Sequence, residues 1–212
     1  MKKILTALLL LAATHVMAAD PQIGNEFKQT VQAIPTDNPG KIEVMEIFWY
    51  GCPHCYHLEP SLEAWVKKLP QDVYFKRVPG VPREDWAPMA KAYYTLEALG
   101  LVDKLHGALF DAIHKQRVLN PTSEKGAIDW ITKQSGLDRK KVAETYNSFS
   151  VNTKVVRAMQ IFRASGATGV PSLVIDGKYL TSSTMAGGNQ EALNVADYII
   201  NHVRQDRASA KH

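Results

Sequence analysis

Residues 42–57 read IEVMEIFWYGCPHCYH, and this stretch decides the fold. Its first part, 42–50, is nearly continuously apolar and rich in strand formers, a pattern typical of a strand that is buried on both faces of a sheet. From Pro53 the pattern changes to helical spacing, which continues until Pro70 through Leu58, Leu62, Trp65 and Leu69. The two cysteines, Cys52 and Cys55, therefore lie where a buried strand turns into a helix.

The segments on either side of this stretch indicate an α/β fold. Residues 73–78, VYFKRV, read as a second strand, so that strand, helix and strand follow in the order of a parallel crossover. Far downstream, GVPSLVIDGKYLT at 169–181 contains two strand-like runs joined by Asp176-Gly177, a favourable two-residue hairpin turn. The chain closes with a helix that carries four apolar residues on one face, Leu193, Ala196, Ile200 and Val203.

Between the strand-like segments, residues 83–150 show helical periodicity and no convincing strand. Asp85 is expected to cap the first helix of this block, which ends at Gly100, and the same period continues through 102–113. Helices are also predicted for residues 123–136 and for about 154–165. A further helix is predicted to begin at Asp138 and to place Val142, Tyr146 and Phe149 on one face.

The N-terminus predicts the compartment. Lys2 and Lys3 precede the apolar run ILTALLLLAA at 4–13, and small residues follow up to Ala18, which is the order of a secretory signal peptide cleaved after Ala18. The alternative is a membrane anchor, but the apolar run is about half of the roughly 20 residues that a spanning helix needs. The sequence therefore predicts a signal peptide at 1–18 and an exported mature protein.

Composition argues against a special class of partner. The formal net charge is +4, from 25 Lys and Arg against 21 Asp and Glu. It falls to +2 without Lys2 and Lys3, because residues 1–18 contain no acidic residue. A nucleic-acid-binding protein would show a strongly basic face or a recognisable motif, and neither is visible. With 45% hydrophobic residues the chain has enough apolar content for a core.

The chain has only two cysteines, Cys52 and Cys55. A disulfide stabilises mainly by closing a loop in the unfolded chain, and a loop this short constrains little. Haem attachment would need a histidine directly after Cys55, where Tyr56 stands, while His57 comes one place too late. A zinc site could use the same cysteines and histidines, but one tight cluster lacks the paired spacing of structural zinc sites. The pair is therefore interpreted as redox-active, without metal or cofactor.

A cysteine at a helix N-terminus meets unpaired N–H groups and the positive end of the helix dipole, which favour thiolate. Even about 2 kcal/mol from the dipole corresponds to only roughly 1.5 pKa units. A stronger shift needs other donors, and His54, as imidazolium, is the candidate. Pro53 suits the first helical turn, where its missing N–H costs nothing. Cys52 is therefore predicted to be the attacking thiol, and the more shielded Cys55 the resolving one.

The CPHC motif at a strand-to-helix turn, with GVPS far downstream before a strand, closely resembles the DsbA family of exported thiol:disulfide oxidoreductases. The resemblance covers about residues 20–205. It implies a thioredoxin fold with an inserted helical domain, divided into 19–82, 83–150 and 151–212. It also implies that Pro171 is the family's cis-proline beside the cysteine pair and that the backbone of Val170 pairs with an extended substrate. An ordinary strand-start proline is the alternative.

Glu46 has two interpretations. It precedes Cys52 by six residues, as an acidic residue does beneath the active site in the similar family, and from there a buried carboxylate could exchange protons with Cys55. The alternative is an ion pair with Lys76 or Arg77. His57 is expected to be a surface residue of the helix, and Pro60 falls where thioredoxin-like proteins often bend the active-site helix.

The resemblance implies a periplasmic, monomeric enzyme that donates its Cys52–Cys55 disulfide to unfolded exported proteins with free cysteines. It also implies a quinone-linked membrane protein of the DsbB type as the partner that reoxidises it, and no nucleic acid. Two rival functions stay open at this point: a reductase or isomerase on the same fold, and a non-catalytic peptide-binding chaperone. Isomerases of this class usually carry a dimerisation domain, and the sequence shows none.

Overall fold

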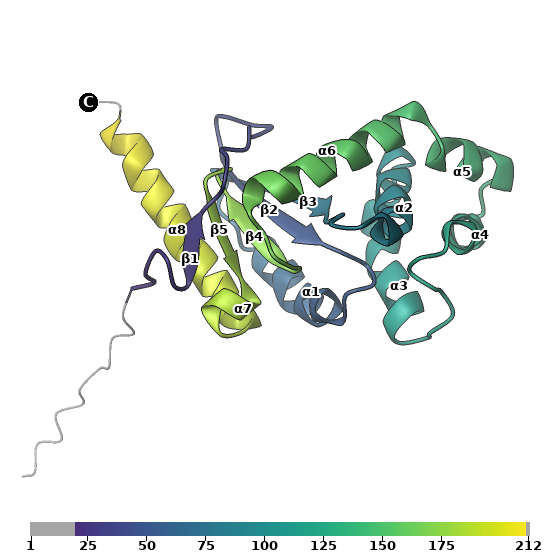
Figure 1. Cartoon of the computed structure of the whole chain (residues 1–212), viewed down its shortest axis with the longest axis horizontal. Helices are drawn as coiled ribbons and strands as arrows, with labels where there is room; N and C mark the ends of the chain where they lie inside the picture. The colour runs from purple at the N-terminus through teal and green to yellow at the C-terminus, as the bar shows by residue number, and fades with distance from the viewer. Residues whose placement is uncertain (1–19, 211–212) are drawn as a thin grey trace, which may run out of the picture.

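The computed structural model describes residues 20–210, and the predicted signal peptide lies outside this range. In chain order its elements are β1 (Phe27–Gln29), β2 (Ile42–Phe48), α1 (Pro53–Val66), β3 (Val73–Pro79), the 3-10 helix η1 (Glu84–Trp86), α2 (Ala87–Ala98), α3 (Val102–His114), α4 (Glu124–Ser135), α5 (Arg139–Tyr146), α6 (Phe149–Ser165), β4 (Ser172–Ile175), β5 (Tyr179–Ser182), α7 (Ser183–Ala186) and α8 (Asn189–Ser209). Figure 1 shows α2 to α5 gathered at one end of the molecule and α8 at the other.

The five strands form one sheet in the order β1-β5-β4-β2-β3. β2 pairs in parallel with β3, as the predicted crossover requires, and antiparallel with β4. The β4–β5 hairpin turns at Asp176 and Gly177, whose φ values of 54° and 64° are the two positive values of a type I′ turn. The short strand β1 was not predicted. It pairs with β5, with Phe27 opposite Thr181.

β2 is buried along its whole length, as predicted, and its side chains alternate between two cores. Ile42 and Val44 pack with Leu58 and Leu62 of α1 and with the apolar face of α8. Met45 and Ile47 face the other core, which continues into α2 to α6. Glu46 stands two residues after Val44 and therefore points to the same face of the sheet, toward α1.

The helical block confirms most of the predicted boundaries. α4 begins after Ser123, whose side chain accepts from Gly126 N–H, and ends at Gly136 in the left-handed conformation. Asp138 caps α5 by accepting from Lys140 and Lys141 N–H. Residues 80–171, including this block, contain no strand of the sheet.

Two predictions in this block are wrong. Asp85 does not cap α2: it lies within η1 and its carboxylate pairs with Arg83. Phe149 does not share a face of α5 with Val142 and Tyr146, because α5 ends at Tyr146 and Ser148 caps a new helix.

The new helix, α6, begins at Phe149, earlier than the predicted residue 154. Phe149 itself is 87% exposed. The predicted domain boundary after Ser150 therefore falls inside α6, and the division into 19–82, 83–150 and 151–212 stays a prediction.

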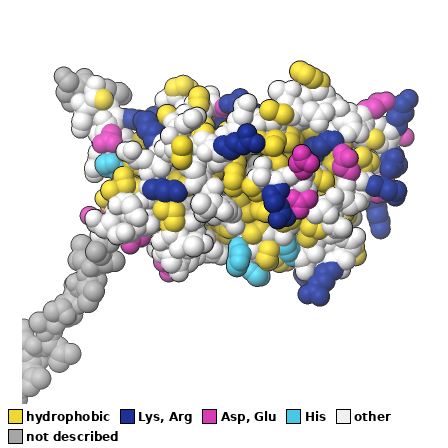
Figure 2. All heavy atoms as spheres, viewed as in Figure 1, with side chains coloured by type: hydrophobic (Ala, Val, Ile, Leu, Met, Phe, Trp, Pro, Cys, Tyr) yellow, Lys and Arg dark blue, Asp and Glu magenta, His cyan; other side chains and the backbone are white. Residues whose placement is uncertain are grey.

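Acidic and basic side chains are interspersed on the face shown in Figure 2, around a hydrophobic area near its centre. Within residues 20–210, no helix combines the length and the apolar composition needed to cross a membrane.

Candidate active site

The cysteine pair lies at the start of α1, just beyond the end of β2. β2 ends at Phe48, two residues earlier than the predicted strand, and the chain turns through Trp49 to Gly51. Cys52 occupies the N-cap position with extended backbone angles, φ −88° and ψ 117°, and Pro53 follows in the first helical turn. The Cys52 N–H donates to Trp49 O at 3.0 Å, and Cys52 O accepts the helical bond of Tyr56 N–H at 3.1 Å. The turn therefore places Cys52 at the N-terminus of α1, next to the free N–H groups of its first turn.

The Cys52 thiol is strongly acidic in this setting. The hydrogen bond from the Cys55 side chain is the main cause that lowers its pKa to about 6, and the backbone N–H groups of Cys55 and His54 also contribute. Burial opposes the shift, and the charge of His54 gives the smallest contribution. His54 is exposed. The low pKa thus arises mainly from Cys55 and the helix start, while the sequence pointed to the His54 imidazolium as the principal extra donor.

Cys55 has the opposite character. Its side chain is fully buried, and burial raises the pKa of its thiol well above the usual value. The hydrogen bond to Cys52, the Cys52 charge and the Glu46 charge raise it further. At neutral pH the two sulfurs therefore form a thiolate and a thiol, with Cys52 as the nucleophile and as the better leaving group.

Val170 and Pro171 lie beside Cys52, although they are far away in the sequence. The Val170–Pro171 peptide bond is cis. The Cys52 Sγ–H donates to Val170 O at 3.3 Å in the dithiol form of the protein. A cavity of about 420 Å³ adjoins this contact and is lined by His54, Val170 and Pro171 together with residues of β4, β5, α7 and α8, among them Ser182, Met185 and Asn189. α7, which supplies part of this lining, was not predicted.

The structure shows the predicted contact of Glu46 with Arg77, and proton exchange with Cys55 stays a prediction. The Glu46 carboxyl group is fully buried and accepts a hydrogen bond from Arg77, Nε to Oε2 3.1 Å, while Lys76 pairs with Asp37 and Glu43 instead. Burial raises the pKa of Glu46 to about 8, and the neighbouring Glu59 carboxylate adds to the shift, against Arg77. A carboxyl group that holds a proton at neutral pH and acts on Cys55 is suited to exchange protons with that thiol.

Sequence reasoning missed two buried polar residues near Glu46 and the turn, Glu59 and His106. Glu59 of α1 shares Arg77 with Glu46, at 2.6 Å from Nη2, and His106 of α3 contacts both Glu59 and Tyr50. A signal for Glu59 was present, because it stands one helical turn after Cys55, among the buried residues of α1. His106 had no such signal, since nothing in the sequence places α3 against this site.

Two further residues of α1 lie where the sequence predicted them. His57 is exposed on α1, and Pro60 lies inside that helix. Among residues 20–210, no group of three or more His, Cys, Asp or Glu side chains is arranged to hold a metal ion.

The family model that describes a DSBA-like thioredoxin domain matches residues 75–200. The thiol:disulfide interchange protein DsbA of Pseudomonas aeruginosa is 41% identical over 211 residues, which cover 98% of each chain. The protein of the same name from Burkholderia cepacia is 40% identical over 215 residues, or 98% of this chain and all of the relative.

Solved structures show the same likeness. The crystal structure of Pseudomonas aeruginosa DsbA matches with a TM-score of 0.80 at 38% sequence identity and covers 91% of this chain and 97% of that one. The oxidoreductase DsbA of Xylella fastidiosa matches with a TM-score of 0.80 at 28% identity, over 87% and 98% of the two chains. The α/β architecture is therefore that of a thioredoxin fold with inserted helices, as the sequence predicted.

Proposed function

The chain belongs to the DsbA family of thiol:disulfide oxidoreductases, and from this premise we propose that it oxidises exported proteins in the periplasm by donating a Cys52–Cys55 disulfide. The observation that carries the proposal is the contrast between the two sulfurs: an acidic Cys52 at the helix start and a buried, weakly acidic Cys55. Stabilising the Cys52 thiolate stabilises the reduced enzyme. The disulfide therefore has a thermodynamic drive to pass to a substrate.

The reaction begins when a substrate thiolate attacks Cys52 Sγ of the oxidised enzyme. A bond forms between Cys52 and the substrate sulfur, the Cys52–Cys55 bond breaks, and Cys55 leaves as a thiolate. Because Cys55 is a strong base, it needs a proton at this moment, and Glu46 is our candidate donor. A second substrate thiolate then attacks the substrate sulfur and releases Cys52, which remains a thiolate, so that the substrate gains a disulfide and the enzyme gains two electrons.

Val170 and Pro171 are proposed to hold the substrate. In the dithiol form the Val170 carbonyl accepts from Cys52, so an extended chain that reacts at Cys52 would pass directly beside this backbone. The adjoining 420 Å³ cavity offers polar hydroxyl groups and the Met185 side chain, which suits varied unfolded segments. We propose that the reduced enzyme presents the same face to a quinone-linked membrane reoxidase of the DsbB type, and that it acts as a monomer.

The proposal is tested by mixing the oxidised protein with a reduced, unfolded protein that has two cysteines. We expect one substrate disulfide for each enzyme disulfide consumed, measured by acid quenching and mass spectrometry. The reductase alternative predicts the reverse, rapid reduction of insulin and little net oxidation. The chaperone alternative predicts binding that persists when both cysteines are replaced by serine, with no exchange.

His54 is expected to have only a modest effect on the redox equilibrium of the Cys52–Cys55 pair. His54→Ala removes the imidazole charge but keeps the backbone N–H that also stabilises the Cys52 thiolate. The equilibrium constant with glutathione should therefore move toward the disulfide, in the less oxidising direction, by less than about tenfold, since tenfold corresponds to one pKa unit. His57→Ala, on the exposed side of α1, is the matched control and should leave the equilibrium unchanged. A larger shift in His54→Ala would mean that the imidazolium, and not Cys55, is the main donor.

A further inference from the structure

Two histidines of α3 hold Tyr50, which stands two residues before Cys52. The Tyr50 hydroxyl lies 2.7 Å from His106 Nδ1, and the Tyr50 carbonyl oxygen lies 2.7 Å from His114 Nε2. Both Tyr50 and His106 are buried. The inserted helices therefore contact the turn that precedes the active-site cysteine through two imidazoles.

The second nitrogen of His106 faces the buried carboxylates. His106 Nε2 lies 3.3 Å from Glu59 Oε1 and has no well-aligned hydrogen-bond partner among the described residues. Burial lowers the pKa of His106, so the ring is neutral at neutral pH and carries a single N–H. Because a carboxylate can only accept, that N–H belongs on Nε2, and Nδ1 accepts from the Tyr50 hydroxyl.

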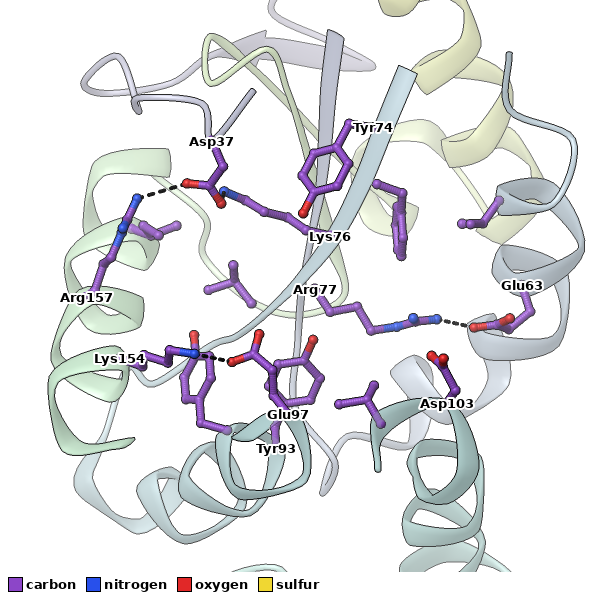
Figure 3. A pocket seen from close by; sticks show the side chains of 16 residues that line it. Asp37, Glu63, Tyr74, Lys76, Arg77, Tyr93, Glu97, Asp103, Lys154 and Arg157 are labelled. Atoms are coloured by element: carbon purple, nitrogen blue, oxygen red, sulfur yellow. Dashed lines mark hydrogen bonds and ion pairs between the residues drawn. The ribbon is translucent and has the colours of Figure 1, made fainter. Parts of the chain in front are cut away.

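Glu59 belongs to a group of three carboxyl groups that share one guanidinium. Arg77 donates from Nε to Glu46 and from Nη2 to Glu59 and Glu63. Figure 3 shows Arg77 extending from β3 toward Glu63, along a hollow of about 530 Å³ that contains neither cysteine. Glu63 is partly exposed to solvent, so the single guanidinium faces two buried carboxyl groups, and one of these two must retain a proton at neutral pH.

The neighbours decide which carboxyl group retains it. Burial opposes ionisation of Glu59, but the contact with His106 Nε2 and the charge of Arg77 together lower the pKa of Glu59. Among the described residues, no hydrogen bond or ion pair joins Glu46 to His106, and Arg77 Nε is the one hydrogen-bond donor to the Glu46 side chain. The ionised Glu59 in turn disfavours a second charge on Glu46. The shared proton therefore resides on Glu46.

We propose that His106 is a positioning residue of the interchange reaction: by donating to Glu59 it keeps the shared proton on Glu46, where Cys55 can use it. The inference rests on the proposed function, because it concerns the proton that Cys55 needs as a leaving group. The proposal also gives the inserted helices a specific role, because His106 belongs to α3 and contacts the carboxyl group of Glu59.

Other titratable groups lie around His106 and Glu46, and each could contribute to a pH dependence of the reaction. They come from three elements and the turn: Glu63, Glu59 and Cys55 of α1, Arg77 of β3, Tyr93 of α2 and Tyr50 of the turn. Burial raises the pKa values of Tyr50 and Tyr93, and the carboxylates raise that of Arg77, so these three do not titrate near neutrality. A change near pH 8 therefore belongs to the carboxyl group of Glu46.

The test follows one step, the resolution of a mixed disulfide. The reduced protein is mixed with oxidised glutathione, and loss of the Cys52–glutathione adduct is followed by acid quenching and mass spectrometry between pH 5 and 9. In this step Cys55 gives its proton to Glu46, its sulfur bonds to Cys52, and glutathione leaves as a thiolate. The rate should rise with the ionised fraction of Glu46, with an inflection near pH 8 in the unaltered chain.

In His106→Leu, Glu59 loses its imidazole donor and takes over the shared proton, so Glu46 ionises more easily. We expect the inflection to move down by roughly one pH unit or more. His106→Gln retains a nitrogen donor near the position of Nε2 and should restore the original profile, whereas His106→Asn retains only the contact with Tyr50 and should behave like His106→Leu. His202→Leu, on α8 and next to Asp206, is the control substitution with no expected effect.

The inference is overturned if His106→Leu and His106→Asn keep the inflection of the unaltered chain. It is also overturned if His106→Gln fails to restore the profile while its thermal unfolding midpoint matches that of the unaltered chain. Failure of the proposed function gives a different result, because the unaltered oxidised chain would then transfer no disulfide to a reduced substrate at any pH. A thermal melt of each variant distinguishes a variant that does not fold from one that folds but lacks the hydrogen-bond donor to Glu59.

Discussion

Cys55→Ser is expected to accumulate mixed disulfides with exported proteins, while Cys52→Ser traps almost none. With a pKa of about 6, the Cys52 thiol is mostly thiolate at neutral pH, whereas Cys55 is almost entirely protonated. The thiolate fractions differ by at least about a hundredfold. Intrinsic nucleophilicity falls as the pKa falls, which reduces the expected difference in trapping to roughly tenfold or more. The side chain of Cys55 is fully buried, so substrates cannot reach its sulfur, and this increases the expected difference in trapping.

The measurement is a non-reducing gel of periplasmic extracts in which each variant carries an affinity tag. Adducts should disappear on reduction, and they should be absent when both cysteines are replaced. Adducts confined to Cys52→Ser would reverse the assignment of attacking and resolving sulfurs. Adducts at equal levels in both variants would show that access and pKa do not distinguish the two positions.

The second large effect concerns stability: the free energy of unfolding of the reduced protein should rise, relative to that of the oxidised protein, as the pH rises from 5 to 8. The folded pKa of Cys52 is about 6, below its unfolded value of about 8.5. A depressed pKa contributes stability that is complete above the unfolded value and is lost as the pH falls through the folded value. The oxidised protein has no thiol to titrate and serves as the internal reference.

Linkage gives the size of this effect. From the two pKa values, ionisation of Cys52 contributes at most about 2.5 kcal/mol at pH 8, about 1.4 kcal/mol at pH 7 and close to zero at pH 5. Solvent screening at the mouth of the active site reduces these values. The chain-entropy model gives the four-residue disulfide loop roughly 2 kcal/mol. The thiolate and the disulfide loop therefore make contributions of similar size, and the balance moves toward the reduced form as the pH rises.

Urea melts of both redox forms at pH 5, 6, 7 and 8 measure the difference. Cys52→Ser in the reduced form is the control. Its free energy of unfolding, relative to that of the oxidised protein, should not rise between pH 5 and 8. Glu46 and Glu59 titrate in both forms, so their effects largely cancel in the comparison. A difference that stays constant between pH 5 and 8 would remove the driving force for disulfide donation and favour the reductase alternative.

Local sequence determined a large part of this protein. The strand-to-helix turn around CPHC follows from a change of apolar period at Pro53, and the β4–β5 hairpin follows from Asp176-Gly177, which tolerates positive φ. Ser123, Gly136 and Asp138 marked helix ends correctly because capping involves residues only a few positions apart. The errors, at Asp85 and Phe149, fell where several candidate caps or apolar residues compete within one turn.

Only the tertiary structure decided the electrostatics of the site. The contacts that set it join residues far apart in the chain: Glu46 to Arg77 across 31 positions, Tyr50 to His106 across 56, and Cys52 to Val170 across 118. Hydrophobic periodicity indicates that a position is buried, but it does not say which polar group lies opposite. A buried charge responds to every neighbour within a few ångströms, so the protonation states of Glu46, Glu59 and Cys55 depend on packing that the sequence pattern does not contain.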